Sequence, residues 1–156
     1  MKIRVRRLQR FAFSTLGVLA VALIVSPNCH GQKHKGINLS NTKGLPFSDG
    51  IVAGKTLYVA GQEGSDDHGK LASGGITAET KAALDNVQKV VKAAGFEMSD
   101  IVSVTVYLAD IQEFGDMNKV YKEVMPDPKP ARATIQAAAL VNNARIEISA
   151  IAVKRR

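Results

Sequence analysis

An arginine on a stiff segment near the C-terminus is the first residue suited to bind a small anion. Arg132 stands in Pro130-Ala131-Arg132-Ala133-Thr134, where the ring of Pro130 restricts the backbone just before an expected strand. A guanidinium held in one direction can bind a carboxylate through two parallel hydrogen bonds. The spacing alone is more typical of a solvated or salt-bridged surface arginine, so both interpretations stay open.

The second candidate is a carboxylate in the last expected strand. Glu147 lies between Ile146 and Ile148, and a carboxylate there could orient or deprotonate an attacking water as a general base. It could also be the structural ion-pair partner of Arg132. The residue pattern alone favours that second role.

A metal site is not expected. His68 follows Asp66 and Asp67 in the segment 63–75, which is rich in glycine. Three potential ligands in a loop, without a supporting shell of hydrogen bonds, are typical of solvated surface residues. Gly74-Gly75, before the next expected helix, lacks the lysine and serine of a phosphate-binding loop.

The first half of the expected domain predicts a hairpin and a helix. Two short β-type runs, 51–53 and 56–60, flank the turn signal Gly54-Lys55. The helix that follows has Thr77 as its cap, Glu79 in its first turn and Gly95 at its end. Its apolar residues recur every three or four positions and should face a sheet: Ala83, Val87, Val90 or Val91, and Ala94.

The second half predicts three more strands and a second helix. Polar residues in 101–108 alternate with an expected buried set, Val102, Val104, Val106 and Leu108. Asp110 can cap a helix that ends before Pro126, with these apolar positions: Phe114, Met117 or Asn118, Tyr121, and Val124 or Met125. Strands at 131–138 and 145–153 are joined by the turn-like Asn142-Asn143.

The element order β-β-α-β-α-β-β predicts an α+β domain with two helices on one face of a mixed sheet. The second sheet face is expected to carry small and polar residues: Arg132, Thr134 and Gln136 on one strand, and Glu147 and Ser149 on another. Such a face meets either water or another subunit.

Residues 1–31 have the pattern of a secretory signal peptide. Five basic residues within the first ten positions precede Phe11 to Val25, which is uncharged and mostly apolar, and small residues surround a cleavage position after Gly31. The alternatives are an uncleaved anchor and a lipoprotein acylated on Cys29, the single cysteine. Cleavage would leave a periplasmic or secreted protein with no thiol and no stable membrane association. We interpret 32–44 as a flexible tether and 45–156 as the folded domain.

The net charge of +7 belongs mostly to this leader. Removing its five basic residues leaves 16 Lys and Arg against 14 Asp and Glu. A nearly neutral domain, without a basic stripe or clustered aromatic residues for base stacking, is a poor candidate for binding nucleic acid.

Eight short segments stand in an order and spacing that cover almost the whole expected domain: Pro46-Phe47-Ser48, Val59-Ala60-Gly61-Gln62, Asp85-Asn86-Val87, Ala93-Ala94-Gly95, Val104-Thr105-Val106-Tyr107-Leu108, Met117-Asn118-Lys119-Val120-Tyr121, Pro130-Ala131-Arg132 and Ile146-Glu147-Ile148-Ser149-Ala150-Ile151-Ala152. Together they resemble the RidA/YjgF family, also labelled L-PSP endoribonuclease. Each segment alone is weak, whereas the ordered set is specific.

The resemblance implies a chorismate-mutase-like fold assembled as a homotrimer, with ligand clefts between neighbouring subunits. It implies hydrolysis of 2-imino acids and their enamines to 2-oxo acids and ammonia, without a metal or organic cofactor. By position, Arg132 would bind the substrate carboxylate, and Glu147 would hold or activate the attacking water. The backbone around Gly61 and Thr134 would line the pocket, with Asn118 near the cleft.

Two positions depart from the family pattern. Phe47 stands where active members commonly have a tyrosine, so it keeps an aromatic wall and lacks the hydroxyl. Thr134 replaces a frequent cysteine, which matters less where the backbone makes the contact. The expected function is therefore a cofactor-independent imine deaminase. The alternative is a binding protein for small organic acids that kept the carboxylate clamp and lost catalysis, and ribonuclease activity is disfavoured.

Overall fold

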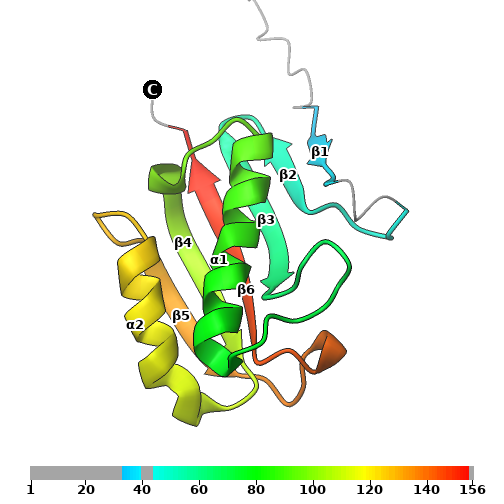
Figure 1. Ribbon diagram of the computed structural model, residues 1–156. Helices are drawn as coiled ribbons and strands as arrows, with labels where there is room; N and C mark the ends of the chain where they lie inside the picture. The colour runs from blue at the N-terminus through cyan, green and yellow to red at the C-terminus, as the bar shows by residue number, and fades with distance from the viewer. Residues whose placement is uncertain (1–32, 40–43, 155–156) are drawn as a thin grey trace, which may run out of the picture. The chain divides into compact units, whose positions relative to one another are not determined.

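The computed structural model describes residues 33–39 and 44–154, so the expected signal peptide lies outside the described residues. The elements in chain order are β1 (Lys35–Ile37), β2 (Gly50–Ala53), β3 (Thr56–Glu63), α1 (Gly75–Ala93), η2 (Met98–Asp100), β4 (Ile101–Leu108), η3 (Ile111–Glu113), α2 (Phe114–Val124), β5 (Ala131–Gln136), η4 (Val141–Asn143) and β6 (Ile146–Val153). Both α-helices lie on one face of a single sheet (Figure 1). The predicted α+β class is confirmed.

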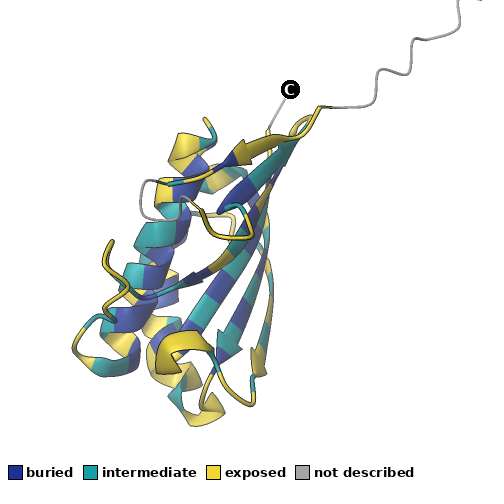
Figure 2. Ribbon diagram, turned by 90° about the vertical axis from the view of Figure 1, so that its right-hand side faces the viewer, coloured by how far each residue is buried: buried dark blue, intermediate teal, exposed yellow. Residues whose placement is uncertain are grey.

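The sheet is mixed, with strand order β1-β2-β3-β6-β4-β5. β4 and β5 are parallel and the other neighbouring pairs are antiparallel. The two last strands, expected to be joined by a turn, are not neighbours, because β4 lies between them. Figure 2 shows the helices on one side of the sheet and the open face on the other.

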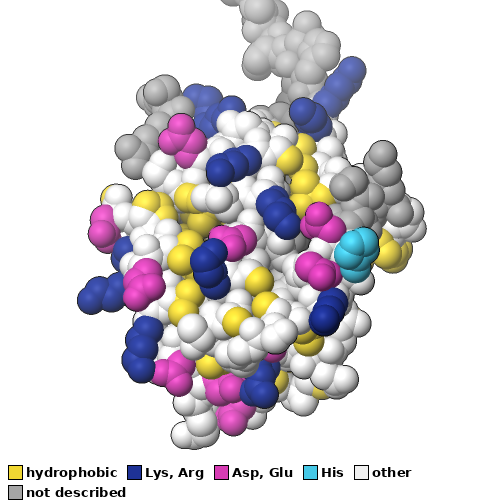
Figure 3. All heavy atoms as spheres, in the orientation of Figure 1, with side chains coloured by type: hydrophobic (Ala, Val, Ile, Leu, Met, Phe, Trp, Pro, Cys, Tyr) yellow, Lys and Arg dark blue, Asp and Glu magenta, His cyan; other side chains and the backbone are white. Residues whose placement is uncertain are grey.

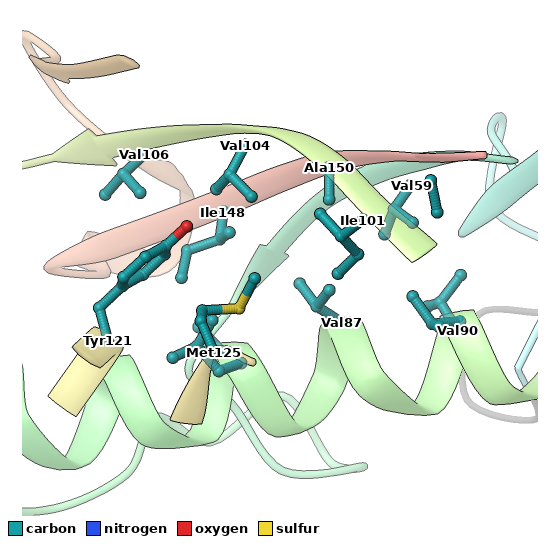
Figure 4. Packing of buried hydrophobic residues seen from close by; sticks show 14 of the residues in the cluster. Val59, Val87, Val90, Ile101, Val104, Val106, Tyr121, Met125, Ile148 and Ala150 are labelled. Carbon is teal, nitrogen blue, oxygen red and sulfur yellow. The ribbon is translucent and has the colours of Figure 1, made fainter. Parts of the chain in front are cut away.

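The core lies between the helices and the sheet. Figure 4 shows Val87 and Val90 of α1 pointing toward Val59, Ile101 and other strand residues. The helix face predicted from the apolar spacing is buried as expected: Ala83, Val87, Val90 and Val91. Burial of such apolar surface is the main driving force of folding. It makes the sheet a fixed platform for the side chains that point away from the core.

The helix starts differ from the prediction, whereas the end of the first helix agrees with it. α1 has Gly74 as its N-cap instead of Thr77, because Gly74 and Gly75 take positive φ values of 121° and 70° that turn the chain into the helix early. Gly95, with φ 77°, follows the C-cap of α1 as predicted. Asp110 caps η3 instead of α2, and its side chain accepts a hydrogen bond from the Gln112 amide.

The predicted buried set of β4 is wrong at its first member. Val102 is 48% exposed, whereas Ile101, Val104, Val106 and Leu108 are buried. The register between β4 and β6 shifts between Ile101 and Ser103. This irregularity reverses the alternation at the start of the strand, which strict period-two spacing could not predict.

Part of the segment expected to be a flexible tether is an edge strand. β1 pairs antiparallel with β2, and Ile37 is only 6% exposed. The Leu39 amide donates to Oδ2 of Asp49 at 2.7 Å, which extends the attachment. Three residues are too few to show a strand period in the sequence. The folded domain therefore includes residues that precede the predicted boundary at residue 45.

The expected grouping on the second sheet face is also wrong. Arg132 and Thr134 pair with Val104 and Val106, which are buried beneath the helices, so these two side chains lie on the helix side. Glu147 alternates with the buried Ile146 and Ile148 and therefore lies on the open face. Alternation shows which residues of one strand share a side, but it does not say which side that is.

Candidate functional site

Arg132 is held by one face of α2. Its Nη2 donates to Oδ1 of Asn118 at 2.6 Å, and its guanidinium carbon lies 4.4 Å from the centre of the Tyr121 ring. Phe114 adds a second ring at 5.6 Å. The structure thus brings together two of the predicted site residues, Arg132 and Asn118, and two aromatic rings orient the guanidinium between them.

The charge of Arg132 has no carboxylate partner in the part of the chain that the structure describes. None of the ion pairs there includes it, and its contact with Sδ of Met117, at 4.0 Å, is long. The salt-bridge interpretation of Arg132 is therefore wrong within one chain. A guanidinium has five N–H donors, so donors remain for an external anion.

Two buried hydroxyls lie near this arginine. Thr134 follows Arg132 on the same side of β5, and neither its Oγ1 nor the Tyr121 hydroxyl has a hydrogen-bond partner among the described residues. Figure 4 shows the Tyr121 hydroxyl directed toward the apolar strand residues Val104, Val106 and Ile148. Burial raises the pKa of Tyr121, and the positive charge of Arg132 opposes this shift. Tyr121 therefore stays neutral beside the guanidinium.

Glu147 lies in a cleft of about 600 Å³. Phe47 and Gly61 line the same cleft, so three predicted site residues meet there. The Phe47 ring is 55% exposed and forms part of the apolar wall. Neither Arg132, Asn118 nor Thr134 lines this cleft.

A bulge in β3 places Gly61 beside Glu147. The register between β3 and β6 shifts between Val59 and Gln62, which buries Gln62 and turns Gly61 to the open face. A Cβ atom at position 61 would overlap the carboxylate of Glu147. Only a glycine there leaves the Glu147 side chain in its present position.

Glu63 is the direct cross-strand neighbour of Glu147. Burial raises the pKa of the Glu147 carboxyl, and the negative charge of Glu63 raises it further. Oε2 of Glu63 accepts a hydrogen bond from Nδ2 of Asn142 at 3.1 Å. A carboxylate whose pKa is raised toward neutral pH is a stronger general base.

Within one chain, Arg132 and Glu147 cannot reach the same small molecule. They project from opposite faces of the sheet, and β4 separates their strands. Neighbouring strands lie about 4.8 Å apart, so the two backbones alone are roughly 10 Å from each other. The candidate site is therefore divided into two half-sites: an arginine half-site around Arg132, with Asn118 and Tyr121, and a carboxylate half-site around Glu147, with Gly61 and Phe47.

Comparison with known proteins places the chain in a family. The family described as Endoribonuclease L-PSP matches residues 42–154. The chain is 43% identical over 110 residues to the human 2-iminobutanoate/2-iminopropanoate deaminase, and the matched region covers 70% of this chain and 80% of the human protein. It is 40% identical over 110 residues to a RutC family protein of Pyrococcus horikoshii, covering 70% and 87%. The chain belongs to the RidA/YjgF family.

Solved structures of RidA/YjgF proteins share the fold. The YjgF gene product of E. coli superimposes with a TM-score of 0.73 at 31% identity, covering 78% of this chain and 99% of that protein. E. coli TdcF, solved with bound serine, has a TM-score of 0.71 at 28% identity, covering 78% and 100%. The family predicted from the eight segments is confirmed.

Some residues of the two half-sites were not predicted as site residues. Two of them, Phe114 and Tyr121, are spaced by four and three positions from the predicted Asn118, which puts them on the same helix face. This spacing is a signal for the aromatic neighbours of Arg132. Glu63 stands two positions after Gly61 on the same strand face. The bulge that turns this face toward Glu147 leaves no signal in the sequence.

The segment around Asp66 and His68, considered above as a metal site, forms local hydrogen bonds. Oδ1 of Asp66 accepts hydrogen bonds from the backbone amides of His68 and Lys70, and these bonds lower the pKa of Asp66. Among the described residues of this RidA/YjgF protein, no group of three or more histidine, cysteine and acidic side chains could hold a metal ion. No helix in that part of the chain is long and apolar enough to cross a membrane.

Proposed function

We propose that the protein hydrolyses 2-imino acids to 2-oxo acids and ammonia in a site that combines Arg132 of one copy with Glu147 of a neighbouring copy. The observation that carries this proposal is the division of the site between opposite sheet faces. One face has a guanidinium that pairs with no carboxylate among the described residues, and the other has a carboxylate of raised pKa. Relatives of this chain that are named 2-iminobutanoate/2-iminopropanoate deaminases support the reaction.

The chemistry requires positioning and one base. The guanidinium of Arg132 binds the substrate carboxylate and fixes the imine carbon near Glu147 of the neighbour. Glu147 takes a proton from water as the oxygen bonds to that carbon, and the electron pair of the C=N bond moves to nitrogen. The amino alcohol that forms from the protonated imine receives on its nitrogen the proton held by Glu147. Ammonia then leaves as the hydroxyl oxygen forms the C=O bond and passes its own proton to Glu147. A positioned base contributes roughly 10²–10⁴-fold to such a step.

The assembly that joins the half-sites is, we propose, a homotrimer formed through the open sheet face. Exposed apolar side chains on this face support a subunit contact: Tyr58, Val102, Ile135 and Val153. Light scattering should therefore give a trimer. The melting temperature should rise with protein concentration, because assembly stabilises the folded state. A monomer at all concentrations would contradict both the trimer and the shared site.

A trapping assay tests the reaction. An amino-acid oxidase generates 2-iminobutanoate in the presence of semicarbazide, and the purified protein should lower the rate of semicarbazone formation by hydrolysing the imine first. Heat-inactivated protein at the same concentration is the control. An unchanged trapping rate over a wide range of protein concentration would exclude deaminase activity on this substrate.

A binding protein without catalysis is the second candidate function, and Phe47 favours it. This ring lines the cleft and offers no hydroxyl to the substrate or the water. Calorimetric binding of 2-oxobutanoate combined with no effect in the trapping assay would support this second function.

Ribonuclease activity is not proposed, because basic and acidic side chains are interspersed on the helix side of the surface (Figure 3). We also propose export directed by residues 1–31, which cell fractionation tests.

Gly61→Ala should lower turnover and leave the fold intact. The added Cβ would collide with the end of a flexible side chain, the Glu147 carboxylate, and push it out of position. A displacement of about 1 Å can cost roughly 10²-fold in rate. The matched control is Gly115→Ala in α2, where the Cβ would meet nothing within 4 Å, so turnover should be unchanged. Equal loss in both variants would contradict the role of Gly61.

Glu63→Gln should shift the acidic limb of the pH–rate profile to lower pH. The base form of Glu147 is lost as the pH falls through its raised pKa, and the charge of Glu63 contributes to that raised value. Removing the charge lowers the pKa of Glu147, so the base form persists to lower pH. Measuring kcat/KM against pH for both proteins checks this. A shift to higher pH, or none, would show that Glu63 does not act on the titrating group.

A further inference from the structure

The carboxylate half-site has more negative charge than the described residues of its own chain neutralise. Among the described residues, Lys89 is the single lysine or arginine that lines the cleft, and its Nζ is paired with Oδ1 of Asp67 at 3.2 Å. Neither Glu63 nor Glu147 takes part in an ion pair within the described chain. Like charges on directly opposite strand residues destabilise a sheet. This arrangement therefore has a cost that a cationic ligand would offset.

The cleft is also larger than a four-carbon substrate needs. Its volume of about 600 Å³ falls in the middle of the range of roughly 300–1,000 Å³ that holds drug-sized ligands. Apolar side chains form much of the wall, among them Leu39, Leu45, Phe47 and Val141. Such walls can pack the methylene groups of a long side chain whose charged end stays near a carboxylate.

We propose that Glu63 is a specificity-determining residue that favours 2-imino acids with a cationic side-chain end, the arginine-derived imine above all. This inference rests on the proposed function. The neighbour's guanidinium holds the substrate carboxylate, Glu147 lies at the imine carbon, and Glu63 is adjacent to Glu147 across the strand pair. A guanidinium on the substrate side chain matches the Glu63 carboxylate through two parallel hydrogen bonds.

Glu63 also has a structural contact that the test must preserve. It accepts a hydrogen bond from Asn142 in η4, a residue with a positive φ of 55°. Glutamine keeps an oxygen acceptor in the same place and removes only the charge. Glu63→Gln therefore separates the charge of residue 63 from its role in anchoring η4.

The experiment compares wild type and Glu63→Gln on two substrates of nearly equal shape. The imines of arginine and citrulline are generated in situ by an amino-acid oxidase, and they end in a guanidinium and a neutral urea group respectively. Wild type should prefer the arginine-derived imine by about tenfold in kcat/KM, the size expected for a half-buried charge pair. In Glu63→Gln the preference should disappear. The altered pKa of Glu147 affects both substrates equally and cancels in the ratio.

An equal ratio of kcat/KM for the arginine-derived imine to kcat/KM for the citrulline-derived imine in wild type and Glu63→Gln would overturn the inference. This outcome includes the case in which a lysine of the neighbouring copy already neutralises Glu63. If wild type hydrolyses 2-iminobutanoate and the ratios are equal, the inference fails and the proposed function stands. If wild type hydrolyses no imine, calorimetry with 5-guanidino- and 5-ureido-2-oxopentanoate decides. A preference for the guanidino acid that Glu63→Gln abolishes supports the inference without catalysis, and equal or absent binding overturns it.

Discussion

Replacing Arg132 with alanine should lower kcat/KM for 2-iminobutanoate by about 10²–10³-fold, because the substrate carboxylate loses a charge-assisted, bidentate partner in a half-buried site. The guanidinium contacts the carboxylate equally in the ground state and the transition state. Most of the loss should therefore be in KM, with a smaller change in kcat. Steady-state kinetics by the trapping assay measures both constants.

Two further variants make this prediction specific to the guanidinium of Arg132. Arg132→Lys keeps the charge and loses the fork and the stacking on Tyr121, so it should recover only part of the activity. Lys119→Ala removes a positive charge from α2, the helix that packs against Arg132, at a side chain that is 77% exposed and paired only with Asp116 among the described residues. Its kinetics should match wild type. Equal losses in Lys119→Ala and Arg132→Ala would indicate a diffuse electrostatic effect.

The sequence predicts the scaffold well because the scaffold depends on repeated local patterns. The period of the α1 residues, the turn at Gly54-Lys55 and the stop at Gly95 all appear in the structure as expected. Each depends on several residues acting within one element. A misjudged start, as at Thr77, shifts an element boundary and leaves the packing unchanged.

The geometry of the site is harder to predict from the sequence, because it depends on how the strands pair with one another. Arg132 and Glu147 could be named as candidates from their types and positions, and the resemblance to the family supplied their roles. Their separation onto two sheet faces follows from the registers of β5 and β6 against β4, which pair Arg132 with Val104 and Glu147 with Tyr107. The exposure of Gly61 and Glu63 beside Glu147 follows from a single register shift in β3. Neither feature has a local pattern in the sequence.

The division into half-sites has a consequence for mixed assemblies. Arg132→Ala and Glu147→Gln should each be nearly inactive alone, the second mainly through kcat, by roughly 10²–10⁴-fold. Co-refolding them in equal amounts should restore about a quarter of wild-type activity, because a heterologous interface then unites an intact Arg132 with an intact Glu147 in one site of four. A site built within one chain would recover no activity in this mixture.

A second mixture also distinguishes a site shared by two chains from a site within one chain, this time by a loss of activity. The double variant Arg132→Ala/Glu147→Gln, co-refolded with an equal amount of wild type, should leave about a quarter of the sites intact if each site needs two wild-type neighbours. Sites confined to single chains would leave about half. Light scattering on both mixtures must show the same assembly as wild type. Restoration in the first mixture together with the lower value in the second can arise only if Arg132 and Glu147 act on one substrate from different copies of the chain.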